Sequence, residues 1–299
     1  MTSPTTLNAF TVDVEDYFQV TGFERQIART DWDSHESRVV ASTHKVLEVL
    51  ASVDVRGTFF VLGWVANRFP KLVREIYAAG HELASHSYWH RLVYSLTPAE
   101  FRQDLADSRK AIEDAAGIRP VAYRAPSFSI TAKSLWALDI LADEGFTIDS
   151  SIFPTRHDRY GIPNARADIH DLELSTGTLT EFPPTVSPLA GMRLPAGGGG
   201  YFRLYPWQFS KYLLGRLNQA GTPFMFYIHP WEVDPQQPRL PHGSRFSRFR
   251  HYVNLKTTEQ KLRLLLEEFR FGTMSEVLDA WRAKRAGKLT SVELATSAN

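Results

Sequence analysis

The chain of 299 residues contains no cysteine. Disulfide bonds and thiolate chemistry are therefore excluded, so any metal ion must be held by histidine, aspartate or glutamate. An excess of charge of one sign is also lacking, because the formal net charge is +1. No strong electrostatic field favours nucleic acid or a membrane surface as a partner.

Long apolar runs are absent as well. No segment approaches the roughly 18 apolar residues of a membrane span. The first residues, MTSPTTLNAF, lack the basic region and apolar run of a secretory signal. If Met1 is the natural start, we expect a cytoplasmic protein without a transmembrane segment. It would associate at most transiently with a membrane-linked substrate or with assembly machinery.

Short apolar segments alternate with longer amphipathic ones. The predicted strands are 7–14, 57–62, 81–85, 120–125, 146–151, 179–184 and 223–229. The predicted helices are 43–51, 65–79, 98–115, 131–144, 206–219 and 258–269. This alternation predicts the α/β class with helices outside a parallel sheet. We expect a single distorted (β/α) barrel with about seven parallel strands.

Residues 1–287 are expected to form this one catalytic domain, and 288–299 a flexible tail. The segment 185–205 is rich in glycine and proline and is predicted to be a long active-site loop, since loops of that length are often functional. Its part 191–205 precedes the strand that leads to His229. We therefore expect it to fold over the mouth of the site.

Polar side chains gather where the predicted strands end. In chain order they are Asp13, Glu15, Asp16, His86, His90, Arg124, Asp149 and His229. In a barrel of this type, chemistry is built at the C-terminal face of the strands, so we expect these residues to meet there. If 86–90 is helical, both imidazoles project from one side and could share a metal ion.

Each of these residues also has a purely structural interpretation. Histidine pairs are common on surfaces, Asp13 fits a cap of the following turn, and Arg124 fits an ion pair with the acidic cluster. His229 follows an apolar strand and fits a hydrogen-bonded core histidine. The shared position at strand ends favours the functional interpretation, since scattered core histidines have no reason to share it.

The motifs resemble, in order, those of the NodB-type polysaccharide deacetylases, carbohydrate esterase family four. Residues 86–90, HSYWH, match the family pattern H-[S/T]-x-x-H, residues 124–126, RAP, match R-x-P, and FMFYIHP contains the histidine that follows an apolar strand. The resemblance spans roughly residues 8–285. The wording DVEDYFQV, GGGYFRLYP and YIHPWE looks most like the subgroup found with exopolysaccharide and exosortase loci.

The first motif departs from the family pattern. The common form has two adjacent aspartates, a base followed by a metal ligand, whereas Val14 follows Asp13 here. Related deacetylases use D-x-[D/E], which makes Glu15 the ligand, and residues 13 and 15 share one face of a strand. Asp16 becomes the ligand instead if the chain turns immediately after Glu15.

The resemblance implies a metal-dependent hydrolase that removes N-acetyl groups from a sugar in a polysaccharide or a lipid-linked oligosaccharide of exopolysaccharide biosynthesis. It implies one divalent ion bound by His86, His90 and either Glu15 or Asp16. Zinc is the default for these donors, and cobalt, nickel and iron suit them too.

Four residues take roles in the reaction that the resemblance implies. Asp13 is the expected base, and His229 the acid toward the departing amine. Arg124 is expected to hold Asp13 ionised and oriented. Asp149 is expected to orient or tune His229.

Residues near the motifs are candidates for contacts with the sugar. Aromatic faces stack on the apolar faces of sugar rings, although each ring fits core packing equally well. Arg203 and Glu232 either contact sugar hydroxyls or pair with each other, and a backbone N–H near Tyr88 or Tyr123 is a candidate oxyanion donor. The expected substrate-binding residues are Tyr88, Trp89, Tyr123, Pro126, Tyr201, Arg203 and Trp231.

Two other functions compete with this one. Related barrels hydrolyse cyclic amides, some without metal, but loss of the histidine pair would have favoured them, and both histidines are present. A catalytically silent carbohydrate-binding protein of a polysaccharide assembly system would be expected to lack Asp13 or His229. This chain has both.

Overall fold

The computed structural model describes residues 6–157 and 159–296, with the side chains of the last helix described as far as Ala286. The strands are β1 (Leu7–Val14), β2 (Thr58–Val61), β3 (Glu82–Ser85), β4 (Ala122–Tyr123), β5 (Ile148–Asp149), β6 (His170–Leu174), β7 (Gly177–Glu181), β8 (Val186–Leu189), β9 (Met192–Pro195), β10 (Met225–Ile228) and β11 (Arg270–Gly272). All but β8 and β9 belong to one curled sheet.

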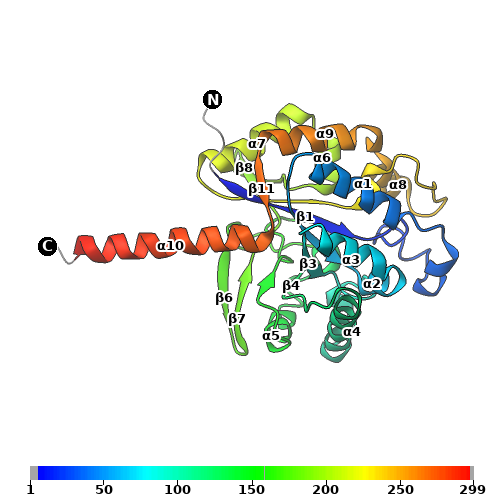
Figure 1. The fold of residues 1–299 in the computed structure, drawn as a ribbon, viewed down its shortest axis with the longest axis horizontal. Helices are drawn as coiled ribbons and strands as arrows, with labels where there is room; N and C mark the ends of the chain where they lie inside the picture. Colours follow the sequence, from blue (N-terminus) through cyan, green and yellow to red (C-terminus); the bar gives the residue numbers. More distant parts are fainter. Residues whose placement is uncertain (1–5, 158, 297–299) are drawn as a thin grey trace.

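Helices pack around this sheet (Figure 1). The α-helices are α1 (Val39–Ala51), α2 (Gly63–Arg68), α3 (Pro70–Ala78), α4 (Pro98–Ala116), α5 (Trp136–Asp143), α6 (Gly199–Leu204), α7 (Trp207–Gln219), α8 (Arg245–Tyr252), α9 (Leu255–Glu268) and α10 (Met274–Thr296). The 3-10 helices are η1 (Arg29–Ser34), η2 (Val93–Ser95), η3 (Pro126–Phe128) and η4 (Pro230–Val233). In Figure 1, α10 extends away from the rest of the body. Among the helices of the described ranges, none is both long and apolar enough to cross a membrane.

Seven strands run parallel, in the order β10-β1-β2-β3-β4-β5-β7. β6 adds to β7 in the antiparallel direction, and β11 pairs with the start of β1. The α/β class and the curled, mostly parallel sheet confirm the predicted distorted barrel. The sheet is an incomplete barrel, since regular strand pairing stops between β7 and β10.

Two local predictions need correction, and a third is tested only in part. The helix predicted over 65–79 is two helices, because Pro70 has no N–H to continue the first one and Phe69 leaves the helical region at φ −131°. The segment 185–205 is not one loop, since it holds the β8–β9 hairpin and α6. Helix α10 continues through 288–296 of the expected tail, residues 297–299 lie outside the described residues, and the tail's flexibility stays a prediction.

Alternation along the strands separates two apolar clusters. In β1, Phe10 and Val12 belong to a cluster shared with the surrounding helices, whereas Ala9 belongs to the cluster that includes Phe60 and Met225 of neighbouring strands. At the start of the strands the second cluster also includes Met274, Val277 and Leu278 of α10. Met274 N donates to Thr58 Oγ1 at 2.8 Å, so α10 covers the N-terminal end of the curled sheet.

Irregular backbone spans the opening between β7 and β10. Ala196 N donates to Thr185 O at 3.0 Å, and Tyr227 N donates to Gly197 O at 2.7 Å. Gly198 has φ 139° and forms a parallel bridge with Tyr227. A Cβ atom at Gly198 would lie 1.9 Å from Tyr227 O, so only glycine permits this close approach.

We expect Gly198→Ala to lower the free energy of unfolding by about 2 kcal/mol or more, because it combines a backbone clash with an unfavourable φ. Urea denaturation followed by circular dichroism measures this. The matched control is Gly215→Ala in α7, where a Cβ meets nothing within 4 Å. The control should be neutral or slightly stabilising. Equal losses for the two variants would contradict the close contact between Gly198 and Tyr227.

Candidate active site

The end of β1 places two carboxylates in one cavity. Asp13 and Glu15 both line it, as expected from the alternation of side chains on a strand, and each residue is only 2% exposed. The chain turns directly after the strand, where Glu15 N donates to Asp13 O at 3.0 Å.

The two histidines of HSYWH meet without a helix. β3 ends at Ser85, and the following turn has left-handed backbone at Ser87 (φ 70°) and His90 (φ 52°). The imidazole centroids of His86 and His90 are 5.4 Å apart. The turn is therefore not helical, yet both histidines reach the same cavity, as the helical alternative would also have required.

A buried carboxylate that the motifs did not reveal fixes this turn. Asp104 of α4 accepts from Tyr88 N at 3.0 Å and from Trp89 N at 3.3 Å. Burial raises the pKa of Asp104, opposed by these hydrogen bonds. The sequence does contain a signal for this residue. A clear capping box defines the helix, and Asp104 lies on the face of the helix that is predicted to be buried, where a carboxylate needs hydrogen-bond partners.

Arg124 connects the carboxylate and histidine halves of the site. Its fully buried guanidinium donates to Asp13 Oδ1 at 2.5 Å and to Thr11 Oγ1 at 2.9 Å. Its backbone carbonyl contacts His86 Nδ1 at 2.8 Å. That contact assigns the proton to Nδ1 and leaves Nε2 of His86 free to bind a ligand. Arg124 and Asp13 are therefore paired as the sequence predicts, and the role of Arg124 in the reaction stays a prediction.

Glu15, His86 and His90 form a buried group whose ligand atoms lie within 4.8 Å of one another. Glu15 Oε2 lies 2.8 Å from His90 Nε2, yet it has no hydrogen bond of regular geometry to any described residue. Burial lowers the pKa of His86 to about 4, so its imidazole is neutral, as a metal ligand must be. Burial alone would raise the pKa of Glu15, but the charges of His90 and His229 outweigh it and lower the value to about 2. This donor set fits a divalent cation.

Asp16, the alternative acid, is engaged elsewhere. Its Oδ2 accepts from Ser37 Oγ at 2.6 Å, from Arg38 N at 2.9 Å and from Val39 N at 3.1 Å. Val39 is the first residue of α1, so Asp16 places its carboxylate at the N-terminus of that helix, where the backbone N–H groups lack other partners. The geometry therefore favours Glu15 over Asp16 as the metal ligand.

His229 approaches the same centre from the end of β10. Its Nδ1 contacts Glu232 Oε1 at 2.7 Å, and its Nε2 lies 3.6 Å from Glu15 Oε1 and 3.9 Å from Asp13 Oδ2. The imidazole stacks on Trp231 with centroids 5.2 Å apart. Burial alone would lower the pKa of His229, but the negative charges of Glu15 and Glu232 outweigh burial and raise the pKa to about 9.

The partner that orients His229 is Glu232, not Asp149 as expected. Asp149 accepts from Ser151 Oγ at 2.5 Å and lies opposite Glu181 in the register of β5 and β7. Burial and the adjacent Asp149 raise the pKa of Glu181, so this pair forms a separate buried carboxyl pair. The spacing H-x-x-E is the signal that could have identified Glu232, because η4 brings residues three apart together.

Four expected substrate-binding residues lie outside the cavity lining. The N–H groups of Tyr88 and Trp89 donate to Asp104, so they are not available as oxyanion donors. Tyr123 is fully buried between Phe101 and Phe146. The fourth, Pro126, begins η3 and precedes Ser127 and Phe128, which do line the cavity.

The other three expected substrate-binding residues line the cavity, whose volume is about 530 Å³. Tyr201 belongs to α6, so part of the segment 191–205 lies at the site face as predicted. Arg203 is buried and donates to Glu232 Oε2 at 2.6 Å and to the carbonyl groups of residues 250, 251 and 253. Two roles are expected for Arg203, contact with sugar hydroxyls or pairing with Glu232, and the structure shows the pairing. Trp231 donates from Nε1 to Glu15 Oε1 at 3.2 Å.

Sequence reasoning missed part of the cavity wall. Phe246 and Phe249 of α8 also line it, and they are 67% and 56% exposed. Aromatic rings alternate with arginines in RFSRFRHY, and this pattern could have drawn attention to a solvent-facing helix at a binding site.

The curled sheet thus brings together a His-His-Glu group that could hold a metal ion and a histidine on the opposite side of the cavity, an arrangement of side chains that metal-dependent hydrolysis can use. Residues 31–146 match the family model "Polysaccharide deacetylase", and residues 150–279 match "Domain of unknown function (DUF3473)". Each match spans less than half of the chain and shows the similarity of that segment alone. The first match agrees with the resemblance that the motifs carry, and residues 150–279 are called the DUF3473 region below. The exopolysaccharide-locus subgroup stays a prediction.

Curated relatives match part of the chain. A chitooligosaccharide deacetylase of a Bradyrhizobium species is 37% identical over 33% of this chain and 43% of its own length. A peptidoglycan-N-acetylglucosamine deacetylase of Bacillus cereus is 32% identical over 32% of this chain and 36% of its own length. The chain thus spans less than half the length of these two relatives.

Solved structures agree over nearly the whole chain, though at low identity. A putative polysaccharide deacetylase from Mycobacterium smegmatis has a TM-score of 0.62 and 21% identity, covering 94% of this chain and 91% of that one. The structure titled Puue allantoinase has a TM-score of 0.60 and 14% identity, covering 93% and 90%. At these identities the likeness shows the fold alone.

We expect Glu15→Ala, His86→Ala and His90→Ala each to lose bound divalent metal, because each removes one donor of three. Elemental analysis of the purified proteins, against the wild type, measures this. Asp16→Ala is the matched control, and it should keep the metal while losing about 1 kcal/mol of stability from α1. Loss of the ion from the Asp16 variant, with retention in the Glu15 variant, would exchange the roles of these two acids.

Proposed function

We propose that this chain is a metal-dependent hydrolase that removes N-acetyl groups from a sugar. The observation that carries the proposal is the meeting of Asp13, paired with Arg124, and the Nε2 atom of His229 beside the Glu15-His86-His90 group. A base, an acid and a candidate cation site in one cavity are what amide hydrolysis requires. The deacetylase names of the partial relatives support the same reaction.

Asp13 is the base in this proposal. Its Oδ1 is occupied by Arg124, which favours the ionised carboxylate, while Oδ2 faces the cavity on the side of His229. A carboxylate fixed at one oxygen and free at the other can take a proton from water without rotating away.

His229 is the acid. Glu232 holds Nδ1, so the proton on Nε2 points toward the centre of the site, and Arg203 in turn holds Glu232 at 2.6 Å. A bound divalent ion would polarise the acetamide carbonyl and lower the pKa of a water molecule. The amine that leaves must gain a proton, and the imidazole is placed to donate it.

We further propose that the substrate is a polysaccharide or lipid-linked oligosaccharide of exopolysaccharide biosynthesis. The support is the amino-acid sequence of the segments DVEDYFQV, GGGYFRLYP and YIHPWE, which contain Asp13, Tyr201 and His229 and resemble that subgroup. Zinc is the proposed ion, on the basis of two imidazoles and one carboxylate without sulfur ligands. Cyclic-amide hydrolysis is not favoured, since the allantoinase likeness extends only to the fold. A silent binding protein is not favoured either, because the residues proposed as base and acid, Asp13 and His229, both line the cavity.

We expect the wild-type protein, supplied with zinc, to release acetate from N-acetylated oligosaccharides such as chitohexaose. A chelator should abolish the release, and Asp13→Asn should keep the metal but lose about 10²–10⁴-fold in rate, the usual contribution of one positioned base. Acetate is measured by an enzyme-coupled assay, and metal content by elemental analysis. Full activity after removal of the metal would overturn the metal-dependent proposal.

The role of His229 is tested with two substrates. His229→Ala should keep the fold and the metal, and it should lose about 10²–10⁴-fold in rate on an N-acetyl sugar, whose amine must be protonated to leave. It should lose much less on an activated aryl acetate, whose phenolate leaves without a proton. An equal loss on the amide and the ester would instead assign His229 to oxyanion stabilisation or to the shape of the cavity.

A further inference from the structure

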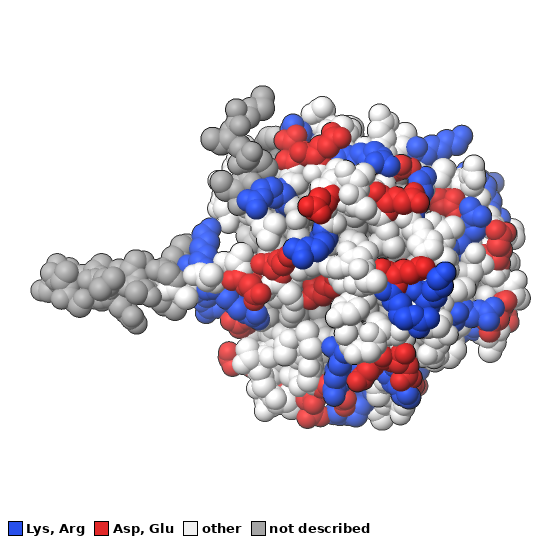
Figure 2. Space-filling model, in the orientation of Figure 1, with Lys and Arg blue, Asp and Glu red and all other residues white. Residues whose placement is uncertain are grey.

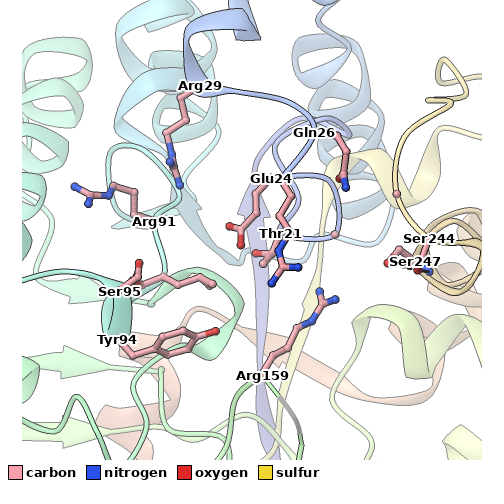
Figure 3. A pocket seen from close by; sticks show the side chains of 14 residues that line it. Thr21, Glu24, Gln26, Arg29, Arg91, Tyr94, Ser95, Arg159, Ser244 and Ser247 are labelled. Atoms are coloured by element: carbon pink, nitrogen blue, oxygen red, sulfur yellow. Dashed lines mark hydrogen bonds between the residues drawn. The ribbon is translucent and has the colours of Figure 1, made fainter.

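Figure 3 shows a second cavity, which is larger than that of the candidate active site and lies next to it. Its volume is about 920 Å³, against about 530 Å³ for the first. The two share Thr21, Gly22, Arg159 and Ser247 as lining residues. An oligosaccharide with one sugar in the first cavity could therefore extend its next sugars into the second cavity. We call this second cavity the arginine groove.

The lining of the arginine groove is strongly biased in charge. It contains Arg25, Arg29, Arg91 and Arg159, and only one described carboxylate, Glu24. Figure 3 shows Arg29 and Arg159 entering the cavity from opposite sides. On the face of the molecule in Figure 2, by contrast, positive and negative side chains are intermingled.

Two of these arginines are fixed in place, Arg29 by a neutral carbonyl group and Arg91 by the carboxylate of Glu100. Arg29 donates from Nε to Trp89 O at 2.8 Å, and Arg91 donates to Glu100 Oε1 at 3.0 Å. Arg25 and Arg159 make no ion pair with any acid among the described residues. Burial lowers the pKa of Arg29, and the nearby Arg91 lowers it further, against the effect of Glu24. The groove thus holds more positive charge than its own acids neutralise.

We propose that the arginine groove binds carboxylate or phosphate groups on the carbohydrate chain that continues from the N-acetyl sugar in the active site. This inference rests on the proposed function, and it narrows the substrate to an acidic N-acetylated glycan. Planar guanidinium groups match the oxygens of carboxylate and phosphate. Tyr94, which is 38% exposed in the same lining, offers a face for a sugar ring.

Binding is measured by calorimetry on the wild-type chain. A chelator is present, so that the probes are not hydrolysed during the measurement. The probes are neutral chitohexaose, a hyaluronan hexasaccharide with alternating glucuronate and N-acetylglucosamine, and UDP-N-acetylglucosamine, which carries a diphosphate. We expect the hyaluronan probe, the diphosphate probe or both to bind about tenfold more tightly than chitohexaose, and added salt to reduce that preference. The ranking of the two acidic probes distinguishes a carboxylate from a phosphate source.

Two variants locate the preference in the groove. Arg25→Gln and Arg159→Gln should each reduce the ratio of acidic to neutral affinity by about two- to fivefold, the effect of one exposed charge contact. The matched control is Arg263→Gln on α9, which removes an exposed arginine paired with Glu259 outside the groove and should leave the ratio unchanged.

Equal affinity for neutral and acidic probes would overturn the arginine groove, and so would an unchanged ratio in both groove variants. The two proposals fail separately. Acetate release without any preference for acidic probes would retain the deacetylase and remove the groove. A preference for acidic probes without acetate release would retain the groove and remove the deacetylase.

Discussion

The ion pair between Arg124 and Asp13 is the interaction on which the rest of the site depends. The guanidinium is fully buried and lies 4.0 Å from the centroid of the Phe60 ring, inside the curled sheet. Removing one partner of such a pair costs about 3–5 kcal/mol, because the other charge is left buried and uncompensated. Both the orientation of the proposed base and the compensation of a buried positive charge therefore depend on this contact of 2.5 Å.

This contact also sets the relative positions of distant strands. Arg124 follows β4, yet its side chain reaches Thr11 of β1, Ser150 beyond β5 and the sulfur of Met225 in β10. Its carbonyl at the same time orients His86 beyond β3. The side chain and the carbonyl group of Arg124 thus connect β4 with β1, β10 and the segments that follow β3 and β5, and the candidate cation site lies beside this residue.

Patterns with a fixed period could be read from the sequence, whereas contacts that depend on irregular backbone could not. Asp13 and Glu15 share a face because a strand alternates strictly, and the strand ends meet because the sheet is parallel. The turn of His86 and His90 depends on left-handed backbone that no spacing encodes. A carboxylate near a strand end, Asp149, is a reasonable partner for the imidazole of His229, but the register of β5 and β7 places it opposite Glu181 instead.

The two halves of the chain divide the work of the site. Residues up to 146 supply His86, His90 and Arg124, which bind or orient, and this half carries the polysaccharide deacetylase match. The DUF3473 region supplies His229 with its Glu232 support, and also the walls formed by Tyr201, Phe246 and Arg159. The two halves meet at Glu15, because Trp231 donates to its carboxylate at 3.2 Å and His229 Nε2 lies 3.6 Å from it. The outer walls of the cavity, by contrast, come mainly from the second half, so under the function proposed above changes at Tyr201 or Phe246 would alter which substrate fits while leaving His86 and His90 in place.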